Sequence, residues 1–322
     1  MRSERVKYID RIKGFAIFCV IVGHLTINPL GHKEFDLIRT VVGTFHVALL
    51  FFLSGFVISE PPSIKKIIKK STTFCMPMIT IGLIFAFFAG YDIMFFVRDG
   101  YKLGYWYLYV LCYFYIFLFP FYYFKNVNSI CFDITYGLLI SVIIYALYRF
   151  LPSFWVGVFS LSLCNLYWPL FFCGFIINKY NLSDYLFSRN WVYSLSLIGY
   201  MLCSYLYIKG NEQIFRFIVI LTPFFFLPLF KYREDSDSFL ERELTKLGRN
   251  SLDIYIYHYL IIWTGLISLE RLGVFLKVTN NVLIEFVLIS FIAYLVCYLC
   301  MFLGFVLKKS SFLKSLIYGD YS

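Results

Sequence analysis

The chain has 322 residues, of which 61% are hydrophobic and 15% are charged. A soluble globular domain is nearer half apolar and a quarter charged, so this composition excludes an ordinary soluble protein. The formal net charge of +10 would suggest a nucleic-acid partner in a soluble chain. Here the Lys and Arg residues cluster at the ends of apolar runs, so membrane topology explains them and no nucleic-acid partner is expected.

Apolar runs of about 18 residues or more recur along the whole chain, and each is long enough to cross a bilayer. They predict an all-α, polytopic bundle of about ten transmembrane helices, surrounded by membrane lipid, in one domain over residues 1–322 with no fused soluble domain. The basic start is followed by no small-residue cleavage site, so we expect a retained first span and not a signal peptide. The predicted spans are residues 9–29, 38–59, 72–91, 104–124, 130–149, 158–178, 190–208, 214–231, 250–269 and 281–307.

The basic residues predict how this bundle is oriented. With ten spans, 20 of the 29 Lys and Arg residues fall on the side that holds both termini. The side richer in Lys and Arg faces the cytoplasm. We therefore expect both termini to be cytoplasmic.

The first predicted span contains a histidine, His24. An ionisable residue inside a span is unfavourable and is a candidate functional residue. With the cytoplasmic boundary near Asp10, His24 lies about 21 Å along the helix, past the midplane of the bilayer. It is either a histidine bonded to a neighbouring helix for packing or a reactive group near the outer face.

The spacing of Lys13 and His24 favours a functional role. Eleven residues are close to three helical turns, so both side chains share one helix face, about 16 Å apart along the axis. Asp10 falls on nearly the same face. This alignment would suit a long anionic ligand whose phosphates stay at the cytoplasmic rim while its reactive end reaches His24. Lys13 can equally be an ordinary cytoplasmic-side lysine.

The second predicted span contains His46 at a depth similar to that of His24, so the two histidines could face one cavity. In the same span Ser54 and Gly55 are small residues that let helices approach closely. We interpret His258, in the ninth span, as structural or as supporting another residue. Asp133 and Glu285 lie near span ends, where a charge is cheaply accommodated.

Aromatic residues including Tyr105 and Trp106 gather at the outer end of the fourth span. They form either a belt at the membrane interface or a stacking surface for a sugar. Cys297 and Cys300 lie in an apolar run and are interpreted as packing residues. No metal-ligand spacing appears in the sequence, and no metal is expected.

Several of these segments resemble motifs of the membrane acyltransferase 3 family. The segment from Tyr8 to His24 resembles its opening motif, in which a basic residue, ten further residues and a histidine follow one another. The segment from Phe45 to Phe56 is similar to its F-H-x-P-L-F-F-x-x-S-G motif, with Ala48 in place of proline. The stretches 105–108 and 251–258 resemble two weaker motifs of the family.

This resemblance implies an O-acyltransferase of the bacterial cytoplasmic membrane. Such enzymes move an acetyl group from acetyl-CoA, or another acyl-CoA, to a hydroxyl of an envelope glycan such as O-antigen, capsule or exopolysaccharide. The resemblance assigns catalysis to His24, and the matched depth adds His46. Lys13 becomes a coenzyme A contact, with Asp10, Lys69 and Lys70 as further candidates. Many members of the family have arginines shortly before the proline of the third span, and Lys69 and Lys70 lie near that position in this chain. Lysine lacks the bidentate fork of arginine. Candidate contacts to the acceptor are Trp106, Tyr105 and Ser54.

Two other functional classes are open from the sequence. A transporter or flippase of lipid-linked sugars would share the spans, the aromatic outer ends and the basic cytoplasmic side. Transporters more often show inverted repeats or helices that are broken within the membrane. A purely structural assembly partner gives no reason for two histidines at matched depth.

Overall fold

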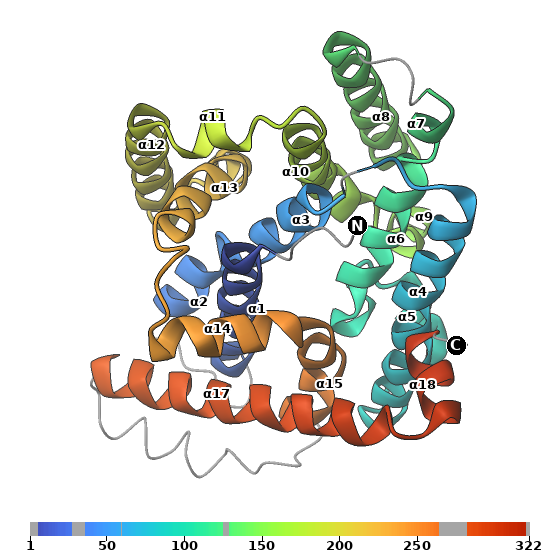
Figure 1. Ribbon diagram of the computed structural model, residues 1–322. Helices are drawn as coiled ribbons and strands as arrows, with labels where there is room; N and C mark the ends of the chain where they lie inside the picture. The colour runs from blue at the N-terminus through green and yellow to red at the C-terminus, as the bar shows by residue number, and fades with distance from the viewer. Residues whose placement is uncertain (1–5, 28–35, 59, 125–128, 264–281, 320–322) are drawn as a thin grey trace. The chain divides into compact units, whose positions relative to one another are not determined.

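The computed structural model describes residues 6–27, 36–58, 60–124, 129–263 and 282–319. All regular structure in these stretches is helical, which confirms the predicted all-α class (Figure 1). Two of the elements are short 3-10 turns, at Lys102–Gly104 and Glu212–Ile214.

The chain divides into two compact units, and each has its own set of helices. The first unit comprises residues 1–53 and 182–304, and the second comprises residues 54–181 and 305–322, so the division falls inside α3 and α17. The helices of the first unit are α1 (Lys7–Ile27), α2 (Asp36–Gly43), α3 (His46–Phe56, as far as Leu53), α11 (Ser183–Phe187), α12 (Asn190–Ile208), α13 (Phe215–Lys231), α14 (Phe239–Arg249), α15 (Ser251–Trp263) and α17 (Val282–Leu307, as far as Gly304). The second unit contains the ends of α3 and α17 together with α4 (Ile64–Phe88), α5 (Ile93–Arg98), α6 (Trp106–Phe117), α7 (Pro120–Tyr123), α8 (Ile130–Phe150), α9 (Ser153–Val158), α10 (Leu161–Lys179) and α18 (Ser311–Tyr318).

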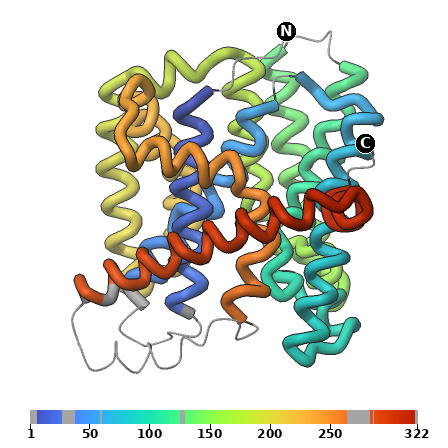
Figure 2. Tube along the Cα trace, turned by 60° about the horizontal axis from the view of Figure 1, so that its bottom comes forward, coloured from blue at the N-terminus to red at the C-terminus, as the bar shows by residue number. Residues whose placement is uncertain are grey.

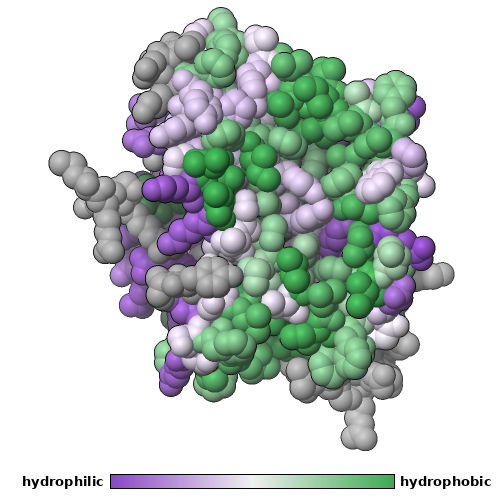
Figure 3. Space-filling view, turned by 90° about the vertical axis from the view of Figure 1, so that its right-hand side faces the viewer, coloured by the Kyte–Doolittle hydropathy of each residue, from purple (hydrophilic) through white to green (hydrophobic). Residues whose placement is uncertain are grey.

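Eight helical segments of the described residues are long and apolar enough to cross a membrane. Only 17% of the most apolar window is buried in α8 and in α12, so most of their apolar surface faces outward, as lipid contact requires. Figure 3 likewise shows hydrophobic residues spread broadly over one face, with hydrophilic residues in smaller patches. The eight segments are Ile38–Phe56, Ile64–Phe88, Trp106–Tyr123, Ile130–Phe150, Leu161–Lys179, Asn190–Ile208, Glu212–Lys231 and Phe286–Leu307.

The other two predicted spans correspond to α1 and α15. α1 has the predicted length but begins with four charged residues in its first seven positions. α15 is described for 13 residues, and the end of the predicted span 250–269 lies outside the described residues. The count of ten spans stays a prediction.

The second predicted span differs from the expected continuous helix over residues 38–59. A turn at Thr44 and Phe45 separates α2 from α3, so His46 begins a helix where a mid-helix position was predicted. The Thr44 hydroxyl donates to the carbonyl of Val41 at 2.6 Å and also lies 2.8 Å from the hydroxyl of Tyr200. These bonds replace the helical pattern locally.

The residues between the eighth and ninth predicted spans, 232–249, lie outside the predicted helices but contain a helix. Ser238 begins α14, where its side chain accepts from the backbone N–H of Glu241 and the Glu241 carboxylate accepts from the backbone N–H of Ser238. This capping box is a sequence signal for a helix start. Side-chain hydrogen bonding from Ser236 and the backbone bond from Ser238 lower the pKa of Glu241 to about 2, so the cap is ionised at neutral pH.

Polar side chains form hydrogen bonds between α14 and α17. The Glu243 carboxylate accepts a hydrogen bond from Tyr294 at 2.8 Å and another from Tyr298. Lys246 donates to the Tyr298 hydroxyl at 2.8 Å and lies 4.3 Å from its ring centroid. The amphipathic α14 therefore belongs to the folded bundle of the first unit.

The opposite side of α14 packs on α1 through two glycines, and the two helices cross closely in both views (Figures 1 and 2). A Cβ atom at Gly14 would lie 1.9 Å from the carbonyl oxygen of Leu244, and one at Gly248 would lie 1.8 Å from that of Asp10. Both obstacles are backbone atoms, so no side chain is tolerated at either crossing position without a shift of a helix.

The second unit contains a similar close approach at Gly55. A Cβ atom there would lie 1.9 Å from the carbonyl oxygen of Phe171 in α10. The prediction that Gly55 lets helices approach closely is therefore confirmed.

Candidate active site

The start of α1 is held by charged residues that are buried. Asp10 is 2% exposed and accepts from Nε of Arg249 at 3.3 Å. Arg11 is 3% exposed and donates to the backbone carbonyls of residues 233, 234 and 236 at 2.6, 3.2 and 2.6 Å. These bonds tie α1 to the segment before α14 and to the end of α14. Lys13, one turn further along, is half-buried.

His24 lies near the other end of α1, where it meets α15. The Tyr259 hydroxyl is 3.4 Å from Nδ1 and 3.3 Å from Nε2 of His24, so it favours neither tautomer. The His24 ring centroid lies 4.8 Å from that of Tyr259 and 5.2 Å from that of His258. The structure thus groups two imidazoles and a phenol around His24.

The hydrogen bonds of His258 determine its tautomer. The ring is fully buried, and Nδ1 donates to the carbonyl of Tyr255 at 2.7 Å, with the carbonyl of Ile254 at 3.2 Å. Nε2 is then the unprotonated nitrogen. It has no hydrogen-bond partner among the described residues. A buried acceptor without a donor is unusual and calls for a ligand or a protonated neighbour.

His46 is positioned by the break between α2 and α3. Its Nδ1 donates to the carbonyl of Val42 at 2.6 Å, and the ring is partly exposed. The adjacent Phe45 stacks on Phe15 of α1, with ring centroids 5.5 Å apart and planes inclined by 4°.

α14 and α15 together attach to α1 at two levels. Near the start of α1, Arg249 pairs with Asp10 and Gly248 packs against the α1 backbone. After one intervening residue the chain begins α15, which brings His258 and Tyr259 to His24. The crossing of α1 and α14 at Gly248 therefore helps to position His258 and Tyr259 beside His24, although the crossing itself lies at a distance from His24.

Sequence reasoning assigned His258 a structural or supporting role and did not single out Tyr259. The signal available was a histidine beside a tyrosine inside the apolar run of α15. The contact between Tyr259 and His24 joins residues more than 230 positions apart, so no local sequence pattern reports it.

The predicted acceptor contacts belong to the second unit. Trp106 stacks on Tyr167 with ring centroids 5.6 Å apart, and its ring is partly exposed. Tyr105 is fully buried, with its ring centroid 6.2 Å from that of Phe85. The Ser54 hydroxyl lies 2.9 Å from the hydroxyl of Tyr107. Trp106 is therefore the member of the aromatic pair with ring surface left for stacking.

Lys69 and Lys70 lie in the first two turns of α4, also in the second unit. Lys69 is exposed, while Lys70 is half-buried with its ammonium 5.7 Å from the ring centroid of Phe74. Their role as phosphate contacts stays a prediction.

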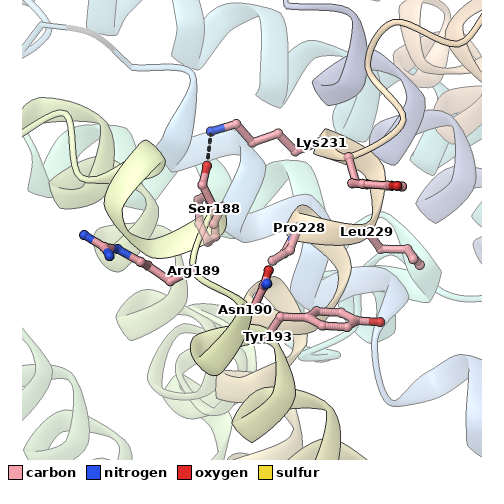
Figure 4. Close-up of a pocket in the computed structure, with 9 residues that line it drawn as sticks. Ser188, Arg189, Asn190, Tyr193, Pro228, Leu229 and Lys231 are labelled. Atoms are coloured by element: carbon pink, nitrogen blue, oxygen red, sulfur yellow. Dashed lines mark hydrogen bonds between the residues drawn. The ribbon is translucent and has the colours of Figure 1, made fainter.

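A pocket of about 490 Å³ lies in the first unit between the start of α12 and the end of α13 (Figure 4). Lys231 donates to the Ser188 hydroxyl at 3.3 Å and pairs with Asp184, while Arg189 points away from the other labelled residues. No residue predicted as a site residue lines this pocket.

The group around His24 has the parts needed for proton transfer at a hydroxyl. A neutral imidazole can remove a proton near pH 7. The His258 Nε2 can accept a hydrogen bond, and the Tyr259 hydroxyl can donate one to developing negative charge. These groups lie on helices, which hold their positions more firmly than loops do.

Comparison with known proteins adds one match. A family model described as an acyltransferase domain matches residues 6–302, which is most of the chain. No curated protein and no solved structure matches.

Proposed function

The chain belongs to the membrane acyltransferase 3 family, and from this membership we propose that it transfers an acetyl group from cytoplasmic acetyl-CoA to a hydroxyl of a bacterial envelope glycan. The acyltransferase activity and the membrane location follow from the family and from the apolar helices. We propose in addition that the donor is acetyl-CoA, that the acceptor is a glycan (O-antigen, capsule or exopolysaccharide), and that the membrane is the bacterial cytoplasmic membrane. The observation that carries the proposal is His24, grouped with His258 and Tyr259 on the helix that begins beside Lys13.

In the proposed reaction His24 acts as general base. It removes the proton of the acceptor hydroxyl as the oxygen attacks the thioester carbonyl. A C–O bond forms, the C–S bond breaks, and the coenzyme A thiolate leaves and takes up the proton from His24. Direct transfer requires no acyl-enzyme intermediate.

The neighbours of His24 have proposed roles in the same step. Once His24 is protonated, its N–H can donate to the unpaired Nε2 of His258, which satisfies that buried acceptor in the charged state. The Tyr259 hydroxyl can donate to the oxyanion that forms at the thioester carbonyl oxygen. His46 orients the acceptor or serves as a second donor.

At the cytoplasmic rim we assign the coenzyme A phosphates to Lys13 and Arg249. The Arg249 side chain is 52% exposed although it pairs with Asp10. Asp10 therefore contributes by holding the guanidinium of Arg249 in place. Lys69 and Lys70 are proposed as further phosphate contacts on the family resemblance. Trp106 and Ser54 are proposed as acceptor contacts, whereas the fully buried Tyr105 is not retained as a direct contact.

The alternative, a transporter of lipid-linked sugars, has one observation in its favour. The turn between α2 and α3 interrupts a membrane segment, as transporter helices often are interrupted at binding sites. An enzyme whose catalytic histidine begins a helix at such a turn explains the same feature. The family match favours the enzyme.

The direct test is an assay of membranes with labelled acetyl-CoA, with and without candidate glycan. We expect label to move to the glycan only when the protein is present. Movement of lipid-linked sugar across the bilayer without acetyl transfer would instead identify the transporter.

Replacement of Lys13 by alanine should weaken the binding of coenzyme A and leave acceptor binding unchanged. A charge-assisted hydrogen bond to phosphate contributes about 1.5–3 kcal/mol, which corresponds to roughly a 10- to 150-fold rise in KM for acetyl-CoA. Steady-state kinetics with each substrate varied in turn measure this. An unchanged affinity for coenzyme A would remove Lys13 from the donor site.

Replacement of His258 by leucine should lower kcat at least about tenfold with little change in either KM, because the protonated state of His24 loses its acceptor. His258→Gln keeps an acceptor oxygen and should recover part of that loss. If both variants lose activity equally and also unfold at lower temperature, His258 serves packing alone.

A further inference from the structure

The last described helix, α18, packs against α4 within the second unit. Ile317 and Tyr318 are buried, and a Cβ atom at Gly319 would lie 2.9 Å from the carbonyl carbon of Thr72. One side of α18 therefore faces α4. The other side remains on the surface of the unit, where Phe312 is 70% exposed and Leu316 is 40% exposed.

This part of the unit is strongly basic. The stretches 60–88 and 305–319 contain seven lysines, and their only acidic residue is Glu60. Two of the lysines, Lys69 and Lys70, have already been assigned to the donor. The remaining lysines and the exposed apolar residues of the same two packed helices are together called the α18 surface. They are Lys65, Lys66, Lys308, Lys309 and Lys314 with Ile64, Ile68, Phe312 and Leu316.

The apolar members of this surface distinguish it from an ordinary solvated set of charges. Phe312 and Leu316 are four residues apart, so they lie on one face of α18. Ile64 and Ile68 are exposed by 56% and 58% with the same spacing on α4. Exposed apolar residues flanked by lysines are typical of helices that lie in the headgroup region of a membrane.

Aromatic rings keep some of these ammonium groups close to the apolar surface. The ammonium of Lys308 lies 4.7 Å from the ring centroid of Tyr318, and that of Lys309 lies 4.7 Å from the ring centroid of Phe305. A ring contact leaves the positive charge in place.

From this arrangement we propose that the α18 surface is a binding site for anionic phospholipid headgroups. The apolar side chains insert beside the acyl chains, and the lysines contact the phosphates. A membrane lipid fits both halves of the surface, whereas a soluble anion would use the lysines and leave Phe312 and Leu316 unpartnered. The positive excess predicted for this end of the bundle agrees with the leaflet that is rich in anionic lipid.

The experiment is lipid titration of the detergent-purified full chain, followed by native mass spectrometry, with phosphatidylglycerol and phosphatidylcholine as the two probes. The wild type should bind phosphatidylglycerol at least tenfold more tightly than phosphatidylcholine, and the preference should shrink with added salt. The combined variant K308Q/K309Q/K314Q should lose at least tenfold in phosphatidylglycerol affinity, with phosphatidylcholine unchanged. Equal affinity for the two lipids in the wild type would overturn the proposal.

The control carries the same loss of three charges at exposed residues of other segments, R149Q/K209Q/R216Q. It should bind phosphatidylglycerol like the wild type, and an equal loss in both triple variants would reduce the effect to net charge and overturn the site. A single F312S change tests the apolar half without altering charge and should also weaken phosphatidylglycerol binding. If inositol hexaphosphate displaces the lipid equally from wild type and F312S, the occupant is a soluble anion and the lipid proposal is wrong.

Discussion

Replacement of His24 by alanine should reduce acetyl transfer by a factor of about 10² to 10⁴, the range that general acid–base groups contribute. The change removes the group proposed to accept the proton of the acceptor hydroxyl. Alanine loses the ring contacts with Tyr259 and His258 but is a strong helix former, so the variant should still insert into membranes and fold. Transfer of labelled acetyl to glycan, normalised to the amount of folded protein, measures the effect.

Two further variants separate chemistry from packing at the same position. His24→Gln keeps a polar side chain but cannot act as a base near pH 7, so it should be as inactive as alanine. Tyr259→Phe keeps the ring contact and removes only the hydroxyl, so its loss should be smaller. Acetyl transfer at the wild-type rate in His24→Ala would remove His24 from the mechanism.

Replacement of Gly248 by alanine should destabilise the protein by about 1–3 kcal/mol, the usual range for forcing an extra carbon into a closely packed contact. The new Cβ would lie 1.8 Å from the carbonyl oxygen of Asp10, so α14 must move away from α1. Thermal unfolding of the purified protein in detergent measures the loss. Gly43→Ala is the matched control, because nothing lies within 4 Å of a Cβ atom at that helical position.

The same change at Gly248 should also reduce acetyl transfer. α14 leads within two residues into α15, so a shift at the crossing moves His258 and Tyr259 relative to His24. Gly43→Ala should leave activity near the wild-type level and be neutral or slightly stabilising. A Gly248→Ala protein with unchanged unfolding temperature and activity would show that α14 does not position the group around His24.

Much of the membrane architecture could be predicted from periodicity and apolar length, because lipid leaves few alternatives to a helix. The expected spans over residues 130–149 and 190–208 nearly coincide with α8 and α12. The interruption at Thr44 was not predicted, since an apolar run contains no strong breaker there and its hydrogen bond to Tyr200 comes from a distant helix. α14 was missed because its charged face resembles a solvated loop, although the capping box was present in the sequence.

The candidate site was predictable only as far as one helix reaches. Lys13 and His24 lie on α1, so helical geometry related them without a structure. The neighbours of His24 come from α15, and the partner of Asp10 comes from the end of α14. Such contacts depend on how helices pack, and no spacing in the sequence reports them.

The hydrogen bonds from Arg11 to the segment before α14 have a practical consequence for protein engineering. Residues 231–249 form the longest polar stretch of the chain and would be the obvious place to insert a fluorescent reporter, an affinity tag or a rigid fusion for imaging. Three backbone carbonyls of that stretch accept hydrogen bonds from one guanidinium. Its second half packs against α1 and is hydrogen-bonded to α17. A fusion there would pull on the helix that leads to His258, so inserts belong elsewhere on the molecule.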